Sequence, residues 1–143
     1  MKTFKQYLLE NKTTPLEEDS LENLFKKYFK NVELENVENG EYSLCDYSRS
    51  IKVPSKYRKE MDWSTSSVDF IYAFVVNENG KFEFSSSVED EDGEHIDDLS
   101  YVIDDTFEIT GKFKDLNDLE KHIKSFKTEV DKQFQKVKTE VKS

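Results

Sequence analysis

Alternating apolar and polar residues around a repeated Glu-Asn-Gly triplet constrain the fold of this chain more than any other feature. In the stretch FVVNENGKFEF, a three-residue loop over residues 78–80 places Phe74 opposite Phe84, whereas a two-residue turn places it opposite Ser85. The first register collects the apolar side chains on one face, and it also pairs Val76 with Phe82 and Phe70 with Val88. The pattern therefore predicts an antiparallel hairpin with Gly80 in the left-handed conformation.

The second copy of the triplet lies in the stretch ELENVENGEYSL. Applying the same three-residue loop to residues 38–40 places Leu34 opposite Leu44. We therefore expect two antiparallel hairpins. Residues 49–66 between them are expected to form an irregular, basic connection.

Two segments have apolar residues at helical spacing. Thr14, Pro15 and Glu17 form a capping box, which predicts an amphipathic helix over residues 15–30. The C-terminal segment has a longer apolar stripe with the same spacing: Leu116, Leu119, Ile123, Phe126, Val130, Phe134, Val137 and Val141. This stripe predicts a long helix that packs over a sheet and projects beyond it, or contacts a partner helix.

A further strand is expected over residues 99–109, where apolar and polar residues alternate again. Together these segments predict one α+β domain over residues 11–143. We expect an antiparallel sheet of about five strands, two hairpins plus one strand, flanked by an N-terminal and a long C-terminal amphipathic helix.

Negative charge is concentrated in one part of the chain. The net charge is -10, and residues 82–111 contain eleven Asp and Glu but no Lys or Arg. Such a segment attracts cationic partners and repels nucleic acid, so we expect no direct nucleic-acid binding. The expected partner-binding residues are Glu89, Asp90, Glu91, Asp92, Glu94, Asp97, Asp98, Asp104, Asp105 and Glu108.

Two interpretations of the acidic segment stay open. Carboxylates on strands and loops can imitate the phosphates of DNA, which would let the protein occupy the DNA channel of a nuclease or polymerase. Acidic surfaces also serve solubility alone. A calcium site is not expected, because aligning Gly93 with the central glycine of an EF-hand loop puts Val88 and Leu99 at its ligand positions.

The basic stretch from Arg49 to Lys59 has a nucleic-acid interpretation, since Tyr57 and Trp63 accompany its charges and aromatic rings can stack on bases. The negative charge of the whole chain opposes that interpretation. In the other interpretation, its bases offset the acidic segment.

No catalytic motif is found in the sequence. His95 lies in the acidic run, His122 in the lysine-rich helix and Cys45 in an expected strand, and no nucleophile motif, phosphate-binding loop or zinc spacing includes them. We therefore expect a non-enzymatic protein without cofactor or metal. The single cysteine is typical of a reducing compartment, and no apolar run approaches the roughly 18 residues that a membrane span needs.

The first ten residues, MKTFKQYLLE, open with Met-Lys-Thr and an aromatic residue and end in Leu-x-Glu. This decapeptide resembles the capsid-targeting propeptide of internal head proteins of T-even-like bacteriophages. The resemblance implies that the phage prohead protease recognises Leu8 and cuts after Glu10, so that the mature chain starts at Asn11.

The resemblance also implies a location and a class of partner. Proteins of that family are packaged in the capsid interior, and some are injected with the DNA into the host cytoplasm and inhibit host defence nucleases. The expected function is therefore binding and inhibition of a host protein. The alternative is a structural component of the prohead core or scaffold that assembles through its C-terminal helix.

Overall fold

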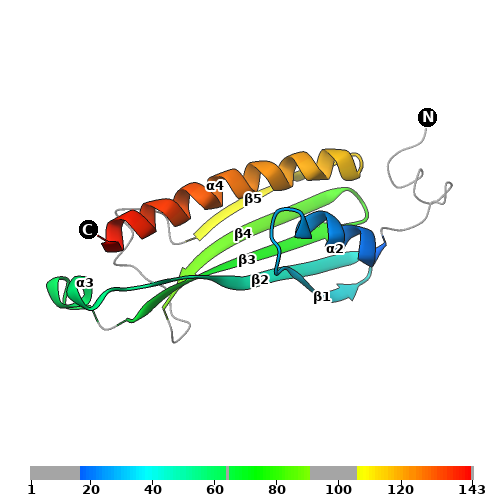
Figure 1. The fold of residues 1–143 in the computed structure, drawn as a ribbon. Coiled ribbons are helices and arrows are strands. Elements are labelled where there is room, and N and C mark those ends of the chain that lie inside the picture. Colours follow the sequence, from blue (N-terminus) through cyan, green and yellow to red (C-terminus); the bar gives the residue numbers. More distant parts are fainter. Residues whose placement is uncertain (1–16, 64, 91–105, 143) are drawn as a thin grey trace.

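In the computed structural model, residues 17–63, 65–90 and 106–142 are described, and they form one sheet with three helices (Figure 1). The elements are, in order, α2 (Glu18–Lys26), β1 (Glu33–Glu38), β2 (Glu41–Lys52), α3 (Ser55–Glu60), β3 (Ser67–Asn77), β4 (Lys81–Glu89), β5 (Thr106–Lys112) and α4 (Leu116–Lys142). The strands follow the order β1-β2-β3-β4-β5, and every neighbouring pair is antiparallel. The predicted α+β class and its antiparallel sheet are confirmed.

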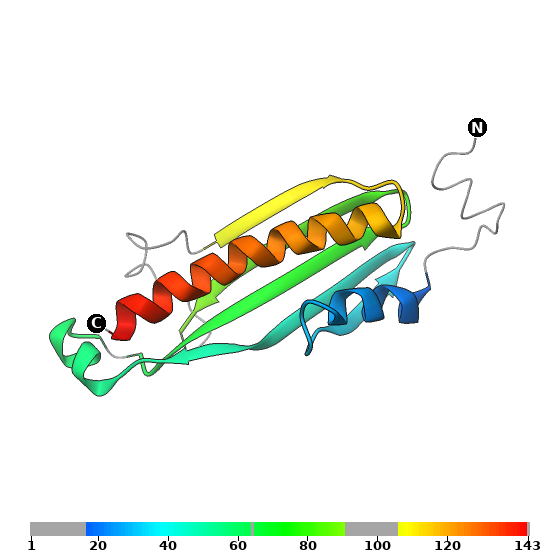
Figure 2. The ribbon, with the colours of Figure 1, turned by 45° about the horizontal axis from the view of Figure 1, so that its top comes forward.

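Both long amphipathic elements lie on the same side of the sheet. α4 runs along β3, β4 and β5, while α2 covers the end of the sheet near β1 (Figure 2). β3 buries every second side chain beneath these helices, from Val68 to Val76, and leaves the alternate side chains half-exposed on the other face. The sheet therefore has one face in the core and one face that no helix among the described residues covers.

An aromatic cluster joins the helices to the sheet. The ring of Phe74, on β3, lies 4.7 Å from the ring of Phe25, 5.0 Å from Phe29, 5.4 Å from Phe84 and 5.6 Å from Phe126. Tilted and edge-on ring pairs of this kind contribute about 0.5–1.5 kcal/mol each beyond their burial. This cluster fixes the position of α2 and α4 over the middle of the sheet.

The register of the β3–β4 hairpin is the one predicted. Phe74 pairs with Phe84, and the other two predicted pairs, Val76 with Phe82 and Phe70 with Val88, are also present. Gly80 has a φ of 91°, which favours glycine, and its carbonyl accepts a hydrogen bond from the N–H of Phe113 at 2.8 Å. This hydrogen bond ties the β3–β4 loop to the segment between β5 and α4.

The β1–β2 hairpin differs from the prediction at its turn. The three-residue loop over residues 38–40 is wrong, because residues 39–40 form a two-residue turn with φ of 52° and 76°. Asn-Gly accommodates two positive φ angles in succession. The predicted pair of Leu34 with Leu44 is nevertheless present, because a register shift between Leu34 and Asn36 compensates for the shorter turn.

The N-terminal helix is shorter than predicted. α2 begins at Glu18 rather than residue 15, because Glu17 has extended backbone with φ of -85° and ψ of 134°; Thr14 lies outside the described residues. At the other end, the carbonyl of Phe25 accepts hydrogen bonds from two successive N–H groups, of Tyr28 and Phe29. The last turn is thereby tightened, and Phe29 enters the core from outside the helix.

The expected irregular connection over residues 49–66 is also wrong in part. β2 continues to Lys52, and the short helix α3 follows. A register shift between Asp46 and Arg49 makes the longer strand possible. There the carboxylate of the buried Asp46 accepts hydrogen bonds from the N–H (2.8 Å) and the hydroxyl (2.6 Å) of Ser48.

The C-terminal half agrees more closely with the sequence. The described part of the last strand starts at Thr106 and continues to Lys112, three residues past the predicted end, while residues 99–105 lie outside the described part of the chain. Six of the eight stripe residues on α4 are buried, Leu116 and Phe134 are partly buried against the core, and even Val137 and Val141 near the end are only 0% and 1% exposed. The predicted packing of this helix over the sheet is confirmed.

One buried polar group offers a test of this core. Ser86, on β4, is 1% exposed, and its hydroxyl has no hydrogen-bond partner in the described part of the chain. We expect Ser86→Ala to raise the free energy of unfolding by about 1 kcal/mol, because it removes an unsatisfied buried hydroxyl. Urea unfolding measures this change. Ser87→Ala, on the other face of the same strand, is the control and is expected to stay within about 0.5 kcal/mol. A loss of stability in Ser86→Ala would mean that the hydroxyl has a partner.

Candidate functional site

The face of the sheet opposite α2 and α4, which we call the open face, is the candidate interaction surface. β2 to β5 contribute side chains to it in alternation, and the pairing of the strands sets them in rows. One row runs across the sheet from Cys45 through Ala73 and Ser85 to Glu108. The next row consists of Ser43, Val75, Glu83 and Thr110.

The open face combines an apolar centre with charged groups around it. Ile71, Ala73 and Val75, on β3, are half-buried at the centre. Carboxylates surround them, and lysines lie at both ends of the strands: the acids are Glu41, Asp69, Glu83, Glu89 and Glu108, and the bases are Lys52, Lys81 and Lys112. Such a surface can offer a partner both apolar contact and negative charge.

Three of the ten predicted acidic residues are in the described part of the chain. Glu89 lies on the open face opposite Asp69, Glu108 lies there opposite Ser85, and Asp90 directly follows β4. The other seven lie outside the described residues: Glu91, Asp92, Glu94, Asp97, Asp98, Asp104 and Asp105.

The sequence analysis did not assign Glu41, Asp69 or Glu83 to the binding surface. Glu83 belonged to the acidic segment but was left out of the predicted site, although the hairpin register places it two residues before Ser85 on the same face. The signal was therefore available in the alternation of β4. Asp69 could have been assigned to the surface from its pairing with Glu89, which follows from the same predicted register.

The charge density of the open face can be compared with that of DNA. Glu83 and Glu89 are six residues apart on β4, which corresponds to roughly 20 Å. Duplex DNA carries about 12 phosphate charges over that length. The open face places four described carboxylates along it: Asp69, Glu83, Glu89 and Glu108. These residues alone therefore reach about a third of the charge density of DNA.

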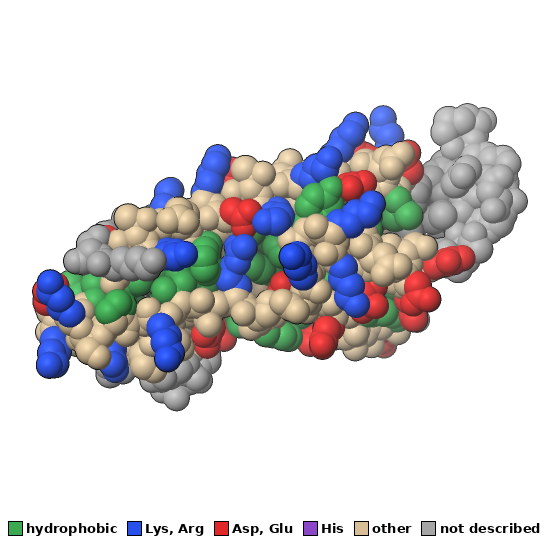
Figure 3. Space-filling view, in the orientation of Figure 1, with side chains coloured by type: hydrophobic (Ala, Val, Ile, Leu, Met, Phe, Trp, Pro, Cys, Tyr) green, Lys and Arg blue, Asp and Glu red, His purple; other side chains and the backbone are tan. Residues whose placement is uncertain are grey.

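The side of the molecule that carries the helices has basic and acidic residues in different places. In Figure 3, which views the molecule as in Figure 1, Lys and Arg side chains are spread along α4 and around α3. Asp and Glu side chains gather mainly at the end that carries α2 and β1. The helices thus present much of the basic charge, while carboxylates outnumber lysines on the open face.

The surroundings of Cys45 and His122, two titratable side chains that could serve in catalysis, do not indicate a catalytic role. Burial raises the pKa of the Cys45 thiol to about 11, so the thiol stays protonated and is a weak nucleophile at neutral pH. His122 is half-buried, and its ring lies 4.5 Å from the ring of Phe82. Its Nε2 atom lies 3.9 Å from the carboxylate of Asp118. His95 lies outside the described residues.

No group of three or more His, Cys, Asp or Glu side chains in the described ranges is arranged to hold a metal ion. Among the helices that these ranges contain, none has the length and apolarity to cross a membrane.

Arg49, expected in the irregular basic connection, instead connects the sheet to α4. Its Nη1 atom donates to the carboxylate of Asp131 at 2.8 Å and to the hydroxyl of Tyr72 at 3.1 Å, and its guanidinium lies 4.5 Å from the centre of the Phe134 ring. The register shift at Asp46 places Arg49 on the core face. This arginine therefore has a structural role, since it joins the sheet to α4.

The contacts of Arg49 change the acidity of its partners. Burial raises the pKa of Tyr72 to about 12, and the guanidinium of Arg49 opposes part of that rise. Burial alone would raise the pKa of Asp131 as well, but hydrogen bonds from Lys127 (2.6 Å) and Arg49 outweigh it and hold that pKa below its ordinary value.

Comparisons with known proteins assign no relative to this chain: no family model, no curated protein and no solved structure matches it. The function is therefore argued from the chain itself.

The Asp131 contacts predict how stability depends on pH. Because the pKa of Asp131 is lower in the folded than in the unfolded chain, its contribution is fully present above about pH 4 and is lost as the pH falls through the folded pKa. We expect Asp131→Asn to lower the free energy of unfolding by up to about 1 kcal/mol at neutral pH, since the side chain is 41% exposed and solvent screens its ion pairs. The difference from wild type should shrink towards zero at about pH 2–3. Urea unfolding at several pH values measures it.

Glu129→Gln is the control for that measurement. It removes a carboxylate on the same helix that is 50% exposed and contacts only Lys132 among the ion pairs of the described residues, so a smaller loss is expected. A difference between Asp131→Asn and wild type that stays constant down to about pH 2 would contradict the assignment, because it could not arise from ionisation of Asp131.

Proposed function

We propose that this chain is a non-enzymatic internal head protein of a bacteriophage, which is packaged in the capsid, injected with the DNA and binds a host protein through the open face. Two observations support the proposal. The decapeptide at residues 1–10 resembles a capsid-targeting propeptide, although it lies outside the described residues. The open face is a broad surface that α2 and α4 leave free.

The open face is the observation that carries the binding proposal. Its centre offers small, half-buried side chains such as Ala73 and Val75 that a partner can contact closely. Its carboxylates, among them the exposed Glu83 and Glu108, would accelerate the encounter with a cationic surface and disfavour acidic partners. Protein interfaces usually have an apolar core and a polar rim. The open face has the same arrangement, with apolar residues at its centre and charged residues around them.

A DNA-binding host protein, such as a defence nuclease, has the cationic surface that this face requires. Inhibition by imitation of DNA is the sharper form of the proposal. The described carboxylates supply about a third of the charge density of a duplex, so full imitation would depend on the acidic residues between 91 and 105. Competition with DNA separates imitation of DNA from ordinary binding to a cationic surface.

The alternative function, assembly of a prohead core or scaffold through the C-terminal helix, required an apolar stripe open to a partner. The stripe on α4 is buried against the sheet, and Val130, Val137 and Val141 are each at most 1% exposed. The residues left exposed on this helix are all polar or charged. The geometry therefore favours the open face over α4 as the binding surface.

The packaging part of the proposal is tested on virus particles. Mass spectrometry of purified virions should detect this protein with Asn11 as its first residue, because the resemblance implies a cut after Glu10. Replacing Glu10 with Gln should abolish that N-terminus. Detecting only chains that begin at Met1, or none, would contradict packaging by this route, whatever the open face binds.

The binding part is tested with paired variants. The double variant Glu83→Gln/Glu108→Gln removes two exposed carboxylates of the open face. We expect it to weaken binding to the host protein that wild type captures by at least tenfold, which corresponds to about 1.4 kcal/mol. Surface plasmon resonance at two salt concentrations measures the affinity and its electrostatic share.

The matched control removes the same charge from the other side of the molecule. Asp19→Asn/Glu129→Gln replaces exposed carboxylates on α2 and α4 and is expected to change the affinity less than about twofold. Equal losses in the two double variants would contradict binding through the open face. If added duplex DNA displaces the partner, the face imitates DNA; if it does not, the partner is bound at a different site from its DNA.

A further inference from the structure

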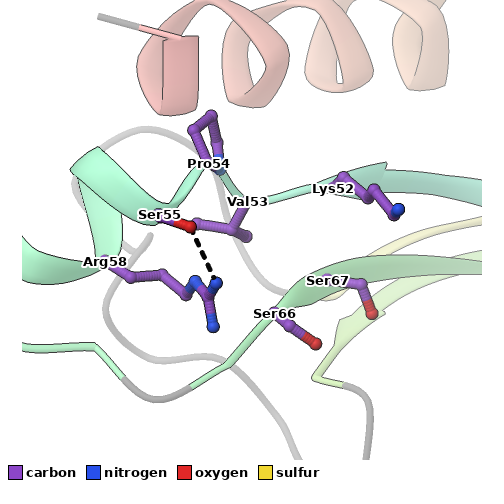
Figure 4. Close-up of a pocket in the computed structure, with 7 residues that line it drawn as sticks. All are labelled: Lys52, Val53, Pro54, Ser55, Arg58, Ser66 and Ser67. Atoms are coloured by element: carbon purple, nitrogen blue, oxygen red, sulfur yellow. Dashed lines mark hydrogen bonds between the residues drawn. The ribbon is translucent and has the colours of Figure 1, made fainter.

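We propose that the cavity between α3 and the start of β3 binds the phosphate group of a small organic phosphate ester. The cavity has a volume of about 680 Å³ and opens beside the long β2–β3 hairpin (Figure 4). Two cations, Lys52 and Arg58, and three serines, Ser55, Ser66 and Ser67, line it together with two apolar residues. This inference rests on other observations than the function proposed for the open face, although Lys52 borders both surfaces.

Arg58 is the residue that points most directly to an anion. Its side chain extends from α3 towards the space between Ser55 and Ser66 (Figure 4). Its Nη2 atom donates to the hydroxyl of Ser55 at 3.2 Å, whereas its Nε atom is buried and has no hydrogen-bond partner within the described ranges. Because Nε has almost no solvent-accessible surface, a ligand in the cavity meets the Nη donors of the guanidinium instead, and these can bind a phosphate oxygen. The guanidinium fork also matches the geometry of two phosphate oxygens.

Lys52 contributes the second cation. It pairs with Ser67 across β2 and β3, so both side chains extend from the same face of the hairpin at the border of the cavity. The backbone N–H of Val53 donates to the carbonyl of Ser66 at 3.0 Å, which holds the two walls together. The cavity thus has a defined framework with the guanidinium of Arg58 inside it, while the Lys52 side chain at its border extends away from Arg58 (Figure 4).

The size and the apolar wall indicate an organic ester rather than a free ion. A volume of about 680 Å³ lies within the range of small-molecule sites and far exceeds one phosphate group. Val53 and Pro54 supply apolar surface beside the cations. A phosphate at Arg58 would leave this surface for the organic part of the ligand.

The charges next to the cavity favour a single phosphate over a nucleic-acid strand. Asp69 lies two residues after Ser67 on the same face and accepts a hydrogen bond from its hydroxyl at 3.4 Å. Glu89 pairs with Asp69 on the neighbouring strand. A polynucleotide leaving the cavity along this face would bring further phosphates against these carboxylates, whereas a small ester ends within the cavity.

The test is a titration of the full, isotope-labelled chain followed by the chemical shifts of its amides. The probes are ribose 5-phosphate, inorganic phosphate and ribose, at constant ionic strength. We expect ribose 5-phosphate to shift the amides of residues 52–58 and 66–67, with an affinity at least about tenfold above that of inorganic phosphate. Ribose without phosphate should shift none of them.

Variants identify the group that carries the binding. Arg58→Gln is expected to weaken binding of ribose 5-phosphate at least about tenfold, and Arg58→Lys to weaken it as well, because lysine keeps the charge but loses the fork. Lys59→Gln is the matched control: it removes the same charge from an exposed position on the same helix that does not line the cavity. It should change the affinity less than about twofold. Thermal unfolding verifies that each variant is folded.

Several results would overturn the proposal. Equal losses in Arg58→Gln and Lys59→Gln would indicate unspecific attraction to a basic surface. If inorganic phosphate binds as tightly as ribose 5-phosphate, the cavity does not contact the organic part of the ester. A short single-stranded oligonucleotide that binds more tightly than the sugar phosphate would make the cavity part of a nucleic-acid surface, and no amide shift at millimolar ligand would exclude the site.

Discussion

The contact of one phenylalanine with four others determines what the rest of this molecule can do. Phe74 lies at the centre of the core face, and its ring centre is at most 5.6 Å from those of aromatic residues on α2, the turn after it, β4 and α4. Burying so much aromatic surface on one face requires both helices to lie there. The opposite face is then left without a helix, and the surface proposed to bind a partner is a direct consequence of where the aromatic residues are.

The same division explains where the charges lie. α4 buries its apolar stripe, so its many lysines must face solvent on the helix side. The strands alternate, so the acids of β4 and β5 must face the other way. Arg49 is the exception, because the register shift before it turns its side chain into the interface between sheet and helix, where it is paired with Asp131. Charge separation thus follows from periodicity, without any dedicated feature.

The sequence predicted those parts of the fold in which a periodic pattern is compatible with only one register or one secondary structure. The β3–β4 register followed from pairing apolar with apolar residues, and α4 followed from its stripe. The β1–β2 turn could not be predicted in the same way, because a shorter turn plus a register shift gives the same pair of Leu34 with Leu44. α3 has six residues and no long apolar pattern, and its position depends on contacts such as that between the rings of Tyr57 and Trp63. The cavity beside it was missed for the same reason: its serines and cations come from three elements that only the fold brings together.

The open face and the cavity share strands β2 and β3, and the two proposals are therefore coupled by charge. Ser67 borders the cavity and Asp69 lies two residues further along, roughly 7 Å away, which is within the screening length of about 8 Å at physiological salt. A phosphate bound at Arg58 adds negative charge at that end and offsets the cations that would otherwise weaken the field of Asp69 and Glu89. On these two proposals, the ligand of the cavity strengthens the attraction of the open face for a cationic protein. By reciprocity, the bound protein strengthens the affinity of the cavity by the same factor.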